Sequence, residues 1–139
     1  MSSIKYIYVA GPMTGSGNPY GNVHDGIVAG QTLLSVGFIP YVPHLTALWG
    51  IVYPSNTWEQ WLRLDEEWLR KCDALLRLPG ESKGADREVK FCEEHGIPVR
   101  HSIDQLIELR EGTEQYAKNV DMARKCGATL LIDEPCPGT

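Results

Sequence analysis

The stretch IKYIYVAGP, residues 4–12, decides the fold class. Its first seven residues are rich in β-branched and aromatic side chains, and the Gly-Pro pair that follows is typical of a loop, so residues 4–10 are predicted to form a strand. In three later stretches, residues 37–42, 96–99 and 127–132, a helix-like segment stops at a glycine and an apolar run follows. Glycine readily adopts the left-handed conformation that closes a helix, so each stretch predicts a helix-to-strand junction.

Strands and helices therefore alternate along the chain. Residues 74–78 (ALLRL) supply one more strand between two helical patterns. Alternation of this kind implies right-handed crossovers and a parallel sheet covered on both faces. We expect an α/β protein, a three-layer sandwich with a mainly parallel five-stranded sheet.

Capping signals predict where the helices begin. Asn22 is expected to cap a helix that runs to residue 36, and the T-x-x-Q and S-x-x-Q patterns at residues 57–60 and 102–105 fit capping boxes. Gly112 is expected to divide residues 102–126 into two helices. The long connection at residues 41–56 is expected to form a lid or a pocket wall.

Length and charge narrow the function classes. The 139 residues suit a single domain, with residues 133–139 as a loose tail. No apolar run approaches the roughly 18 residues of a membrane span, and the first residues lack the layout of a signal peptide, so we expect a cytoplasmic protein with no membrane partner. With 13 Lys and Arg against 18 Asp and Glu, the net charge of −5 disfavours a nucleic-acid polymer as partner.

The cysteines and histidines give no metal-binding pattern. The four cysteines are widely and irregularly spaced, which indicates reduced thiols rather than a disulfide framework. Cys92-x-x-His95 is a ligand-like pair, but no second pair matches its spacing. We therefore expect no metal and no cofactor.

A carboxylate interrupts the apolar stripe of the helix after Thr57. Apolar side chains recur there at steps of three and four, the pattern of a helix face packed on a sheet, and Asp65 falls within that stripe, whereas Glu66 and Glu67 point elsewhere. Burial disfavours the charged form of a carboxyl and raises its pKa, as a general acid near neutral pH requires. Asp65 is thus a candidate acid.

The next helix has a second inward carboxylate, Glu88, beside Val89. It lies near the helix start, where the macrodipole favours negative charge, so we expect Glu88 to stay ionised where Asp65 need not. Both helices follow loops at the carboxyl edge of the strands, where ligands bind in open α/β sheets. The alternative is that both carboxylates are satisfied polar groups of the core, bonded to an amide or to an arginine such as Arg63 or Arg87.

Two glycine-containing loops are candidate anion cradles. In GPMTGSG, residues 11–17, backbone amides and the Thr14 and Ser16 hydroxyls can approach a phosphate or sugar, although the spacing fits neither a dinucleotide fingerprint nor a Walker A loop. Ser82 with Gly84 forms a second cradle. Tyr8 is either a phenolic donor to the pocket or a core tyrosine.

Together these motifs resemble the nucleoside 2-deoxyribosyltransferase superfamily, whose relatives include deoxynucleoside 5′-monophosphate N-glycosidases. The resemblance rests on YVAGPMTG at residues 8–15, on Asp65 ahead of Asp73, and on S-x-G-A-x-x-E at residues 82–88, and it covers roughly residues 4–100. It is strongest to small phage and bacterial members with a Gly-Pro-Met-Thr-Gly opening.

This resemblance implies a flavodoxin-like sheet and cleavage of the bond between a nucleobase and its sugar. It implies that Glu88 attacks the anomeric carbon and forms a glycosyl-enzyme intermediate, that Asp65 protonates the departing base, and that Tyr8 hydrogen-bonds the nucleophile. A serine at the position of Ser82 implies a 5′-monophosphate substrate, and family members commonly borrow residues from a neighbouring subunit, which implies a homodimer or larger homo-oligomer. The expected substrate-binding residues are Gly11, Met13, Thr14, Gly15, Ser82 and Gly84.

Carboxyl chemistry agrees with such a mechanism, because one carboxylate can trap an oxocarbenium-like sugar while a second, protonated carboxyl neutralises the leaving nitrogen. In a retaining enzyme the carboxyl oxygens should lie about 5 to 5.5 Å apart. Asp86 departs from the family, which often has glycine there, and makes the approach to the sugar more charged and more crowded.

Two other functions stay open. Residues 78–80 and 84–88 partly match the motif of cytokinin-activating phosphoribohydrolases, but its second glycine and its threonine are missing. A non-catalytic nucleotide sensor or sponge would use the same pocket, with the carboxylates binding ribose hydroxyls.

Overall fold

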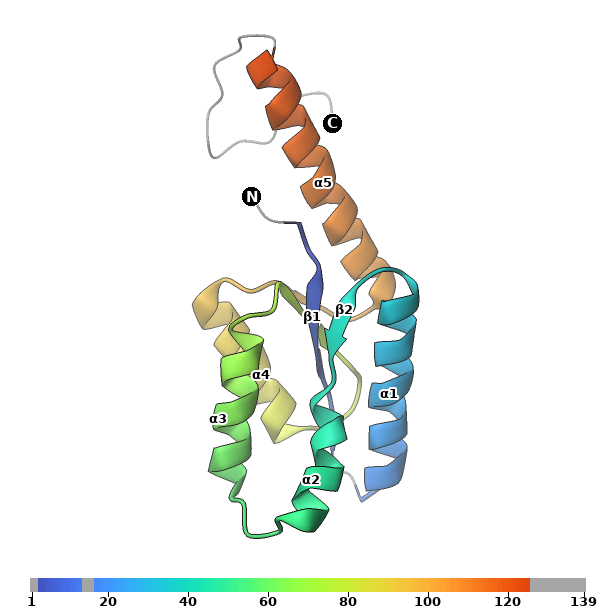
Figure 1. Cartoon of the computed structure of the whole chain (residues 1–139), viewed down its shortest axis with the longest axis vertical. Coiled ribbons are helices and arrows are strands. Elements are labelled where there is room, and N and C mark those ends of the chain that lie inside the picture. Colours follow the sequence, from blue (N-terminus) through green and yellow to red (C-terminus); the bar gives the residue numbers. More distant parts are fainter. Residues whose placement is uncertain (1–2, 14–16, 126–139) are drawn as a thin grey trace.

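The computed structural model describes residues 3–13 and 17–125, and it alternates strands with helices (Figure 1). The strands are β1 (Tyr6–Ala10), β2 (Ile39–Tyr41), β3 (Ala74–Arg77) and β4 (Val99–Arg100). The helices are α1 (Pro19–Ser35), α2 (Thr46–Val52), α3 (Trp58–Leu69), α4 (Lys83–His95) and α5 (Ile103–Lys125), with a 3₁₀ turn, η1 (Pro43–Leu45), before α2.

The strands form one parallel sheet in the order β2-β1-β3-β4. The described residues thus contribute four strands, not the expected five, and the fifth predicted strand, residues 127–132, lies outside them. The order is compatible with a flavodoxin-like fold. It reverses direction between β1 and β3, the position at which open α/β sheets form a ligand crevice beyond the carboxyl ends of the strands.

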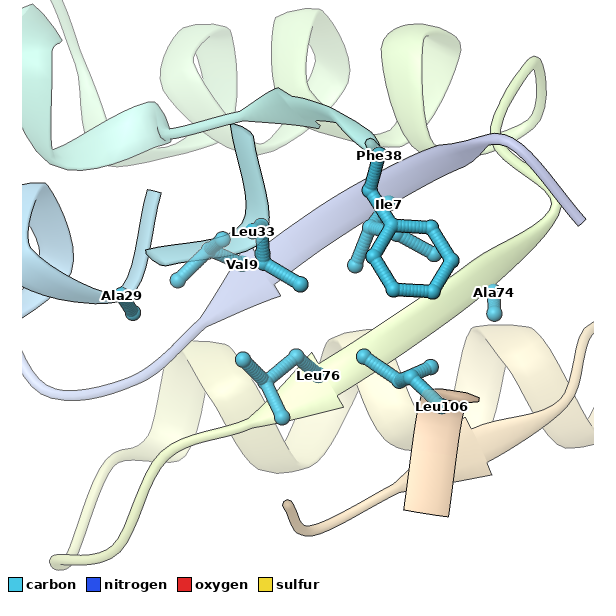
Figure 2. Close-up of a cluster of buried hydrophobic side chains, with 8 residues drawn as sticks. All are labelled: Ile7, Val9, Ala29, Leu33, Phe38, Ala74, Leu76 and Leu106. Atoms are coloured by element: carbon cyan, nitrogen blue, oxygen red, sulfur yellow. The ribbon is translucent and has the colours of Figure 1, made fainter. Parts of the chain in front are cut away.

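Alternate residues of β1 and β3 supply two separate cores. Ile7 and Val9 point to the face that α1 and α5 cover, where they pack with Leu33 and Leu106 (Figure 2). Tyr8 and the other alternate residues face α3 and α4 instead. Because side chains of a strand alternate between faces, both faces of the sheet are buried and the three-layer sandwich is confirmed.

Two helix-to-strand junctions are confirmed. Gly96 closes α4 in the left-handed conformation with φ of 68°, and Gly37 follows α1 with φ of 94°. Both positive φ values favour glycine because it has no Cβ to clash with the backbone. The strands β4 and β2 begin within three residues of these glycines.

The start of α1 differs from the prediction. Asn18 rather than Asn22 caps the helix, because its side chain accepts a hydrogen bond from the Gly21 amide and Pro19 fits the first helical position. Asn22 lies in the first turn, where its side-chain Nδ2 donates to the Met13 carbonyl at 2.9 Å.

The other two capping patterns begin helices as expected. Thr57 and Gln60 form a full capping box at α3. Ser102 accepts from the Gln105 amide, while the Gln105 side chain accepts from His101 instead of from Ser102.

The predicted break at Gly112 is wrong, because α5 continues through it without interruption. One interior glycine costs a helix only about 1 kcal/mol, which the surrounding helix-forming residues can offset. The far half of α5 extends beyond the sheet (Figure 1). Within residues 3–13 and 17–125, no helix is both long and apolar enough to cross a membrane.

Candidate active site

A cavity of about 1020 Å³ opens beside the carboxyl ends of β1 and β3. Its walls come from the loop after β1, from α2 and its approach, from α3, and from the start of α4. Residues 41–56 contribute Pro43 and several α2 residues, so the predicted pocket wall is confirmed. Asp65 and Glu88 line the same cavity, one from each of two successive helices.

Asp65 lies on the inner face of α3. Leu62 and Leu69, at steps of three and four from it, are buried, and Leu69 packs in the core beneath the sheet residues Tyr8 and Leu75. The Oδ1 atom of Asp65 is fully buried and has no hydrogen-bond partner. Burial raises the pKa of Asp65 to about 7, although a hydrogen bond from Tyr41 lowers it. The prediction of a partly buried carboxyl with a raised pKa is confirmed.

The apolar stripe around Asp65 is less buried than its spacing indicates. Trp58 and Trp68 are 54% and 48% exposed, whereas Leu62 and Leu69 reach the core. Trp58 lines the cavity instead of packing within the core.

Glu88 lies in the second turn of α4 and is only 6% exposed. The Tyr8 phenol donates a hydrogen bond to its Oε2 atom. Burial raises the pKa of Glu88 to about 8; the Tyr8 hydrogen bond opposes this rise and the Asp65 charge adds to it. Desolvation thus opposes the effect of the helix start, which favours the ionised form of Glu88.

Tyr8 is a core tyrosine, and its hydroxyl contacts one of the candidate carboxyls. Its side chain is fully buried in the core between the sheet and α3 and α4, and its hydroxyl is still the donor to Glu88. Burial raises the pKa of Tyr8 well above its ordinary value, and the charge of Glu88 is the second cause of the increase. The phenol therefore keeps its proton and can serve only as a donor to the carboxylate.

Tyr41 is a site residue that sequence reasoning missed. It pairs with Tyr8 across β1 and β2, and their ring centroids are 5.5 Å apart. Burial and the Asp65 charge raise the pKa of Tyr41 to about 12. Its apolar, β-prone surroundings predicted a strand, but only the pairing of β2 with β1 brings it to Asp65.

Neither candidate carboxyl is held by an arginine. Among the described residues, Arg87 pairs with Glu66 at 3.0 Å, and no ion pair involves Asp65 or Glu88. The alternative of two arginine-bound core carboxylates is thus not supported. Burial without a paired cation explains why both pKa values rise.

Arg77, at the end of β3, organises the loop before α4, and sequence reasoning missed it too. It donates to the Leu78 carbonyl, to the Gly80 carbonyl at 2.9 Å and to Asp86 at 3.1 Å. Asp86, the departure from the family pattern, lines the cavity with this arginine as its partner. The arginine therefore offsets part of the negative charge that Asp86 adds.

The two glycine loops meet at the cavity. Gly11 and Met13 line it, and a Cβ at Gly11 would lie 2.9 Å from the Leu78 Cβ, so a larger residue would push the loops apart. Thr14 and Gly15 lie outside the described residues.

At the start of α4, Ser82 and Gly84 line the cavity together with Lys83, a cation that sequence reasoning did not single out. The Ser82 hydroxyl accepts from the Ala85 amide at 3.1 Å and caps the helix. A hydroxyl, an ammonium group and free amides at a helix start can hold an anion.

The buried side chain of His44 contacts the loop that follows β1. It is 1% exposed, and its Nε2 lies 3.1 Å from the Pro12 carbonyl. A carbonyl only accepts, so Nε2 carries the proton and the buried Nδ1 is left without a partner. Burial lowers the pKa of His44, so the ring is neutral near pH 7. In the described part of the chain, no group of three or more His, Cys, Asp or Glu side chains could hold a metal ion.

The fold and the cavity define a class. It is a parallel α/β protein with two carboxyls at the carboxyl edge of its sheet that form no ion pair among the described residues. A family model described as "Domain of unknown function (DUF4406)" matches residues 5–101, and the chain belongs to this family. The matched span contains all four described strands and both carboxyls, and α5 begins beyond it. No curated protein matches the chain.

Proposed function

We propose that this protein cleaves the N-glycosidic bond of a nucleoside or deoxynucleoside, or of its 5′-monophosphate, and passes the sugar to water or to a second base. One observation carries the proposal: Asp65 and Glu88 line one cavity, have raised pKa values and form no ion pair with any residue that the structure describes. The resemblance to nucleoside 2-deoxyribosyltransferases supports the same chemistry. The proposed enzyme is a cytoplasmic homo-oligomer without a cofactor.

In the first step the Glu88 carboxylate forms a bond to the anomeric carbon as the bond from that carbon to the base nitrogen breaks. The electron pair stays with the base, and Asp65 delivers a proton to it. Tyr8 donates to Glu88 and orients the attacking oxygen.

In the second step water attacks the anomeric carbon and gives a proton to Asp65, while Glu88 leaves as the carboxylate. If a second base attacks instead, it forms a new nucleoside by the same bond exchange. Both routes return each carboxyl to its starting state.

The two pKa values bear on which protonation state reacts. Glu88 must be ionised and Asp65 protonated, although the pKa of Glu88 is about 8 and that of Asp65 about 7. In a coupled pair these values belong to the pair, which holds one proton between them. The reactive arrangement is thus a minor form of the singly protonated pair, and it is most abundant between pH 7 and 8.

The start of α4 supports a phosphate on the substrate. Ser82 and Lys83 line the cavity on the side of Glu88, at the amino end of the helix. We expect Ser82→Ala to weaken the binding of a 5′-monophosphate more than that of the nucleoside. Equal effects on both ligands would contradict a phosphate site at Ser82.

A second candidate is a nucleotide sensor or sponge without catalysis. The pKa of Glu88 near 8 favours it, because a protonated carboxyl is a poor nucleophile and a good hydrogen-bond donor to a ribose hydroxyl. The phosphoribohydrolase alternative gains no separate support from the cavity.

The decisive experiment incubates the full chain with deoxynucleosides, ribonucleosides and their 5′-monophosphates and follows free base by chromatography. Glu88→Ala should abolish base release, while Glu93→Ala, an exposed position on the same helix, should not. Tight binding by the wild type without release would support the sensor instead. A second base added to the mixture distinguishes transfer, which makes a new nucleoside, from hydrolysis.

A further inference from the structure

Helix α2 and the residues next to it carry an apolar face that is open to solvent. Large apolar side chains recur at steps of three and four over residues 45–52, the spacing of a helix face that packs on other elements. The side chains at these positions nevertheless remain 49–72% exposed. Together with Tyr53 they are called the outer face of α2, which consists of Leu45, Leu48, Trp49, Val52 and Tyr53.

The opposite side of α2 holds small residues. Thr46, Ala47 and Gly50 line the cavity. Successive residues of a helix are about 100° apart, which puts these three on the side away from Leu48 and Val52. The helix therefore turns its small residues to the molecule and its large apolar residues to solvent, the reverse of an ordinary surface helix. In Figure 1, α2 lies at the end of the molecule opposite the far half of α5.

Packing within the chain contributes little to the stability of α2. No residue of this seven-residue helix is buried. Helices shorter than about 12–15 residues are marginal by themselves and depend on the packing of an apolar face. Trp49 contacts Trp61 edge to face and ties one point of α2 to α3. The rest of the outer face stabilises the helix only when something covers it.

The outer face is large enough for a protein interface. Five large side chains at this exposure present on the order of 600 Å², the upper end of the largest apolar patches on monomers. A standard interface takes about 800 Å² from each partner and has a polar rim. The outer face and the uncharged residues around it supply an area of that order.

Charge indicates which partner fits. Residues 41–58 contain no Asp, Glu, Lys or Arg, whereas the whole chain has a net charge of −5. Two copies of the chain repel each other least where an uncharged surface meets another. Helices that bind lipid surfaces carry Lys and Arg beside their apolar face, and this segment has neither. An uncharged apolar face is complementary to an equal face, which a two-fold axis supplies.

We propose that two copies of this chain pair through the outer faces of α2, with the two helices antiparallel about a two-fold axis. Leu48 and Trp49, in the middle of the helix, then lie nearest the axis and meet their own symmetry mates. The inference specifies the oligomer that the proposed function includes and rests on it in that respect, but it requires no glycosidic chemistry. Pairing and ligand binding use opposite sides of α2, so each copy keeps its own cavity while the partner supports the cavity wall.

The test measures the mass of the full chain by sedimentation velocity over a range of micromolar concentrations. We expect twice the monomer mass for the wild type and the monomer mass for Leu48→Asp, because two carboxylates would face each other in a dry interface. The dissociation constant of the dimer should rise at least about tenfold. Leu48 is 72% exposed in the single chain, so the variant should still show a cooperative thermal transition.

A mixture of two charge variants tests whether the face pairs with itself. Leu48→Lys should also sediment as a monomer. An equimolar mixture of Leu48→Asp and Leu48→Lys should regain the dimer, because opposite charges then meet across the axis. Recovery of this kind requires that the same position of both copies lies in the interface.

Two further variants keep the result interpretable. Tyr20→Asp places the same charge on a side chain of α1 that is 90% exposed, and it should sediment as the wild type does. If Leu48→Asp shows no thermal transition, Val52→Asp decides the matter, because Val52 belongs to the same outer face and is 69% exposed.

Several results would overturn the inference. They are a wild type that stays monomeric at high micromolar concentration, dimers of Leu48→Asp at wild-type strength, a charge mixture that stays monomeric, or a monomeric Tyr20→Asp. Wild-type binding to phosphatidylcholine vesicles that Leu48→Asp lacks, without a dimer in solution, would assign the outer face to a lipid surface instead. The proposed function fails separately. If the chain pairs through α2 but no nucleotide releases its base, only the glycosidic chemistry is lost, and base release by a monomeric wild type overturns only the pairing.

Discussion

Tyr8 and Tyr41 occupy paired positions on the neighbouring strands β1 and β2, and each phenol lowers the pKa of a different carboxyl. The Tyr8 hydroxyl donates to Glu88 of α4, and Tyr41 lowers the pKa of Asp65 of α3. The two rings lie 5.5 Å apart and face the same layer of helices. The sheet register thus sets how far apart the two donors are, and the helices bring the carboxyls to them.

We expect a bell-shaped pH profile of kcat/KM with its maximum between about pH 7 and 8, the pKa values of Asp65 and Glu88. Asp65→Asn should lower the rate, most with poor leaving bases, and should remove the decline at high pH. It should also move the remaining limb to lower pH, because the Asp65 charge raises the pKa of Glu88. Steady-state rates from pH 5 to 9.5 test this.

The matched control for that profile is Glu67→Gln, an exposed carboxylate on the same helix, which should keep both limbs. A decline at high pH that persists in Asp65→Asn would contradict the general-acid role.

The two tyrosines should act on different limbs of the pH profile. Each hydrogen bond lowers the pKa of its carboxyl, so Tyr8→Phe raises that of Glu88 and Tyr41→Phe raises that of Asp65. Ionised Glu88 then becomes rarer near pH 7, and kcat/KM of Tyr8→Phe should fall about tenfold for each pKa unit. Tyr41→Phe should instead extend activity above pH 8, because protonated Asp65 persists longer.

Both profiles are measured with one substrate under the same conditions. If Tyr8→Phe moved the descending limb, or Tyr41→Phe the ascending limb, the phenols would not tune separate carboxyls.

Stability should fall as pH rises, because of Glu88. Its pKa is raised from 4.5 to about 8 in the folded chain, so its contribution is fully present below about pH 4.5 and is lost as pH increases through 8. Glu88→Gln carries no such charge. The free energy of unfolding of this variant minus that of the wild type should therefore increase from pH 5 to pH 9 by a few kcal/mol, on the order of 1.4 kcal/mol per unit of pKa shift.

Urea unfolding at the two pH values measures this difference. Glu93→Gln, exposed on the same helix, should show little change between pH 5 and pH 9. A Glu88→Gln variant whose relative stability is the same at both values would rule out a strongly raised pKa.

Two helical glycines should respond in opposite directions to alanine. A Cβ at Gly26 would lie 2.7 Å from Cγ and Nδ1 of the buried His44 ring, so Gly26→Ala should destabilise the fold by about 1–3 kcal/mol through overpacking. A Cβ at Gly112 meets nothing within 4 Å, and Gly112→Ala should stabilise α5 by up to about 1 kcal/mol. Thermal or urea unfolding measures the change in stability of both variants. A neutral or stabilising effect of Gly26→Ala would show that the His44 ring can move away from the added methyl group at little cost.

Local patterns predicted those features that depend on neighbouring residues in the chain. The helix-closing glycines at 37 and 96 and the capping box at Thr57 were predicted because each acts within one helical turn. Periodicity placed Asp65 on the inner face of its helix for the same reason. The helix start at Asn18 and the unbroken α5 were missed, because more than one cap is compatible with the first pattern and a single glycine is a weak helix breaker.

The sequence by itself determined the alternation of strands and helices, the two inward carboxyls and the loops that precede them, since these follow from periods of two and 3.6 residues and from turn chemistry. Only the tertiary structure decided that Tyr41 reaches Asp65, that Arg77 orders the loop before α4 and that Trp61 lines the cavity, because these contacts depend on which strands and helices become neighbours. It also decided that the pKa values of both carboxyls are raised. Depth of burial sets the desolvation of a charge, and depth depends on how the layers pack.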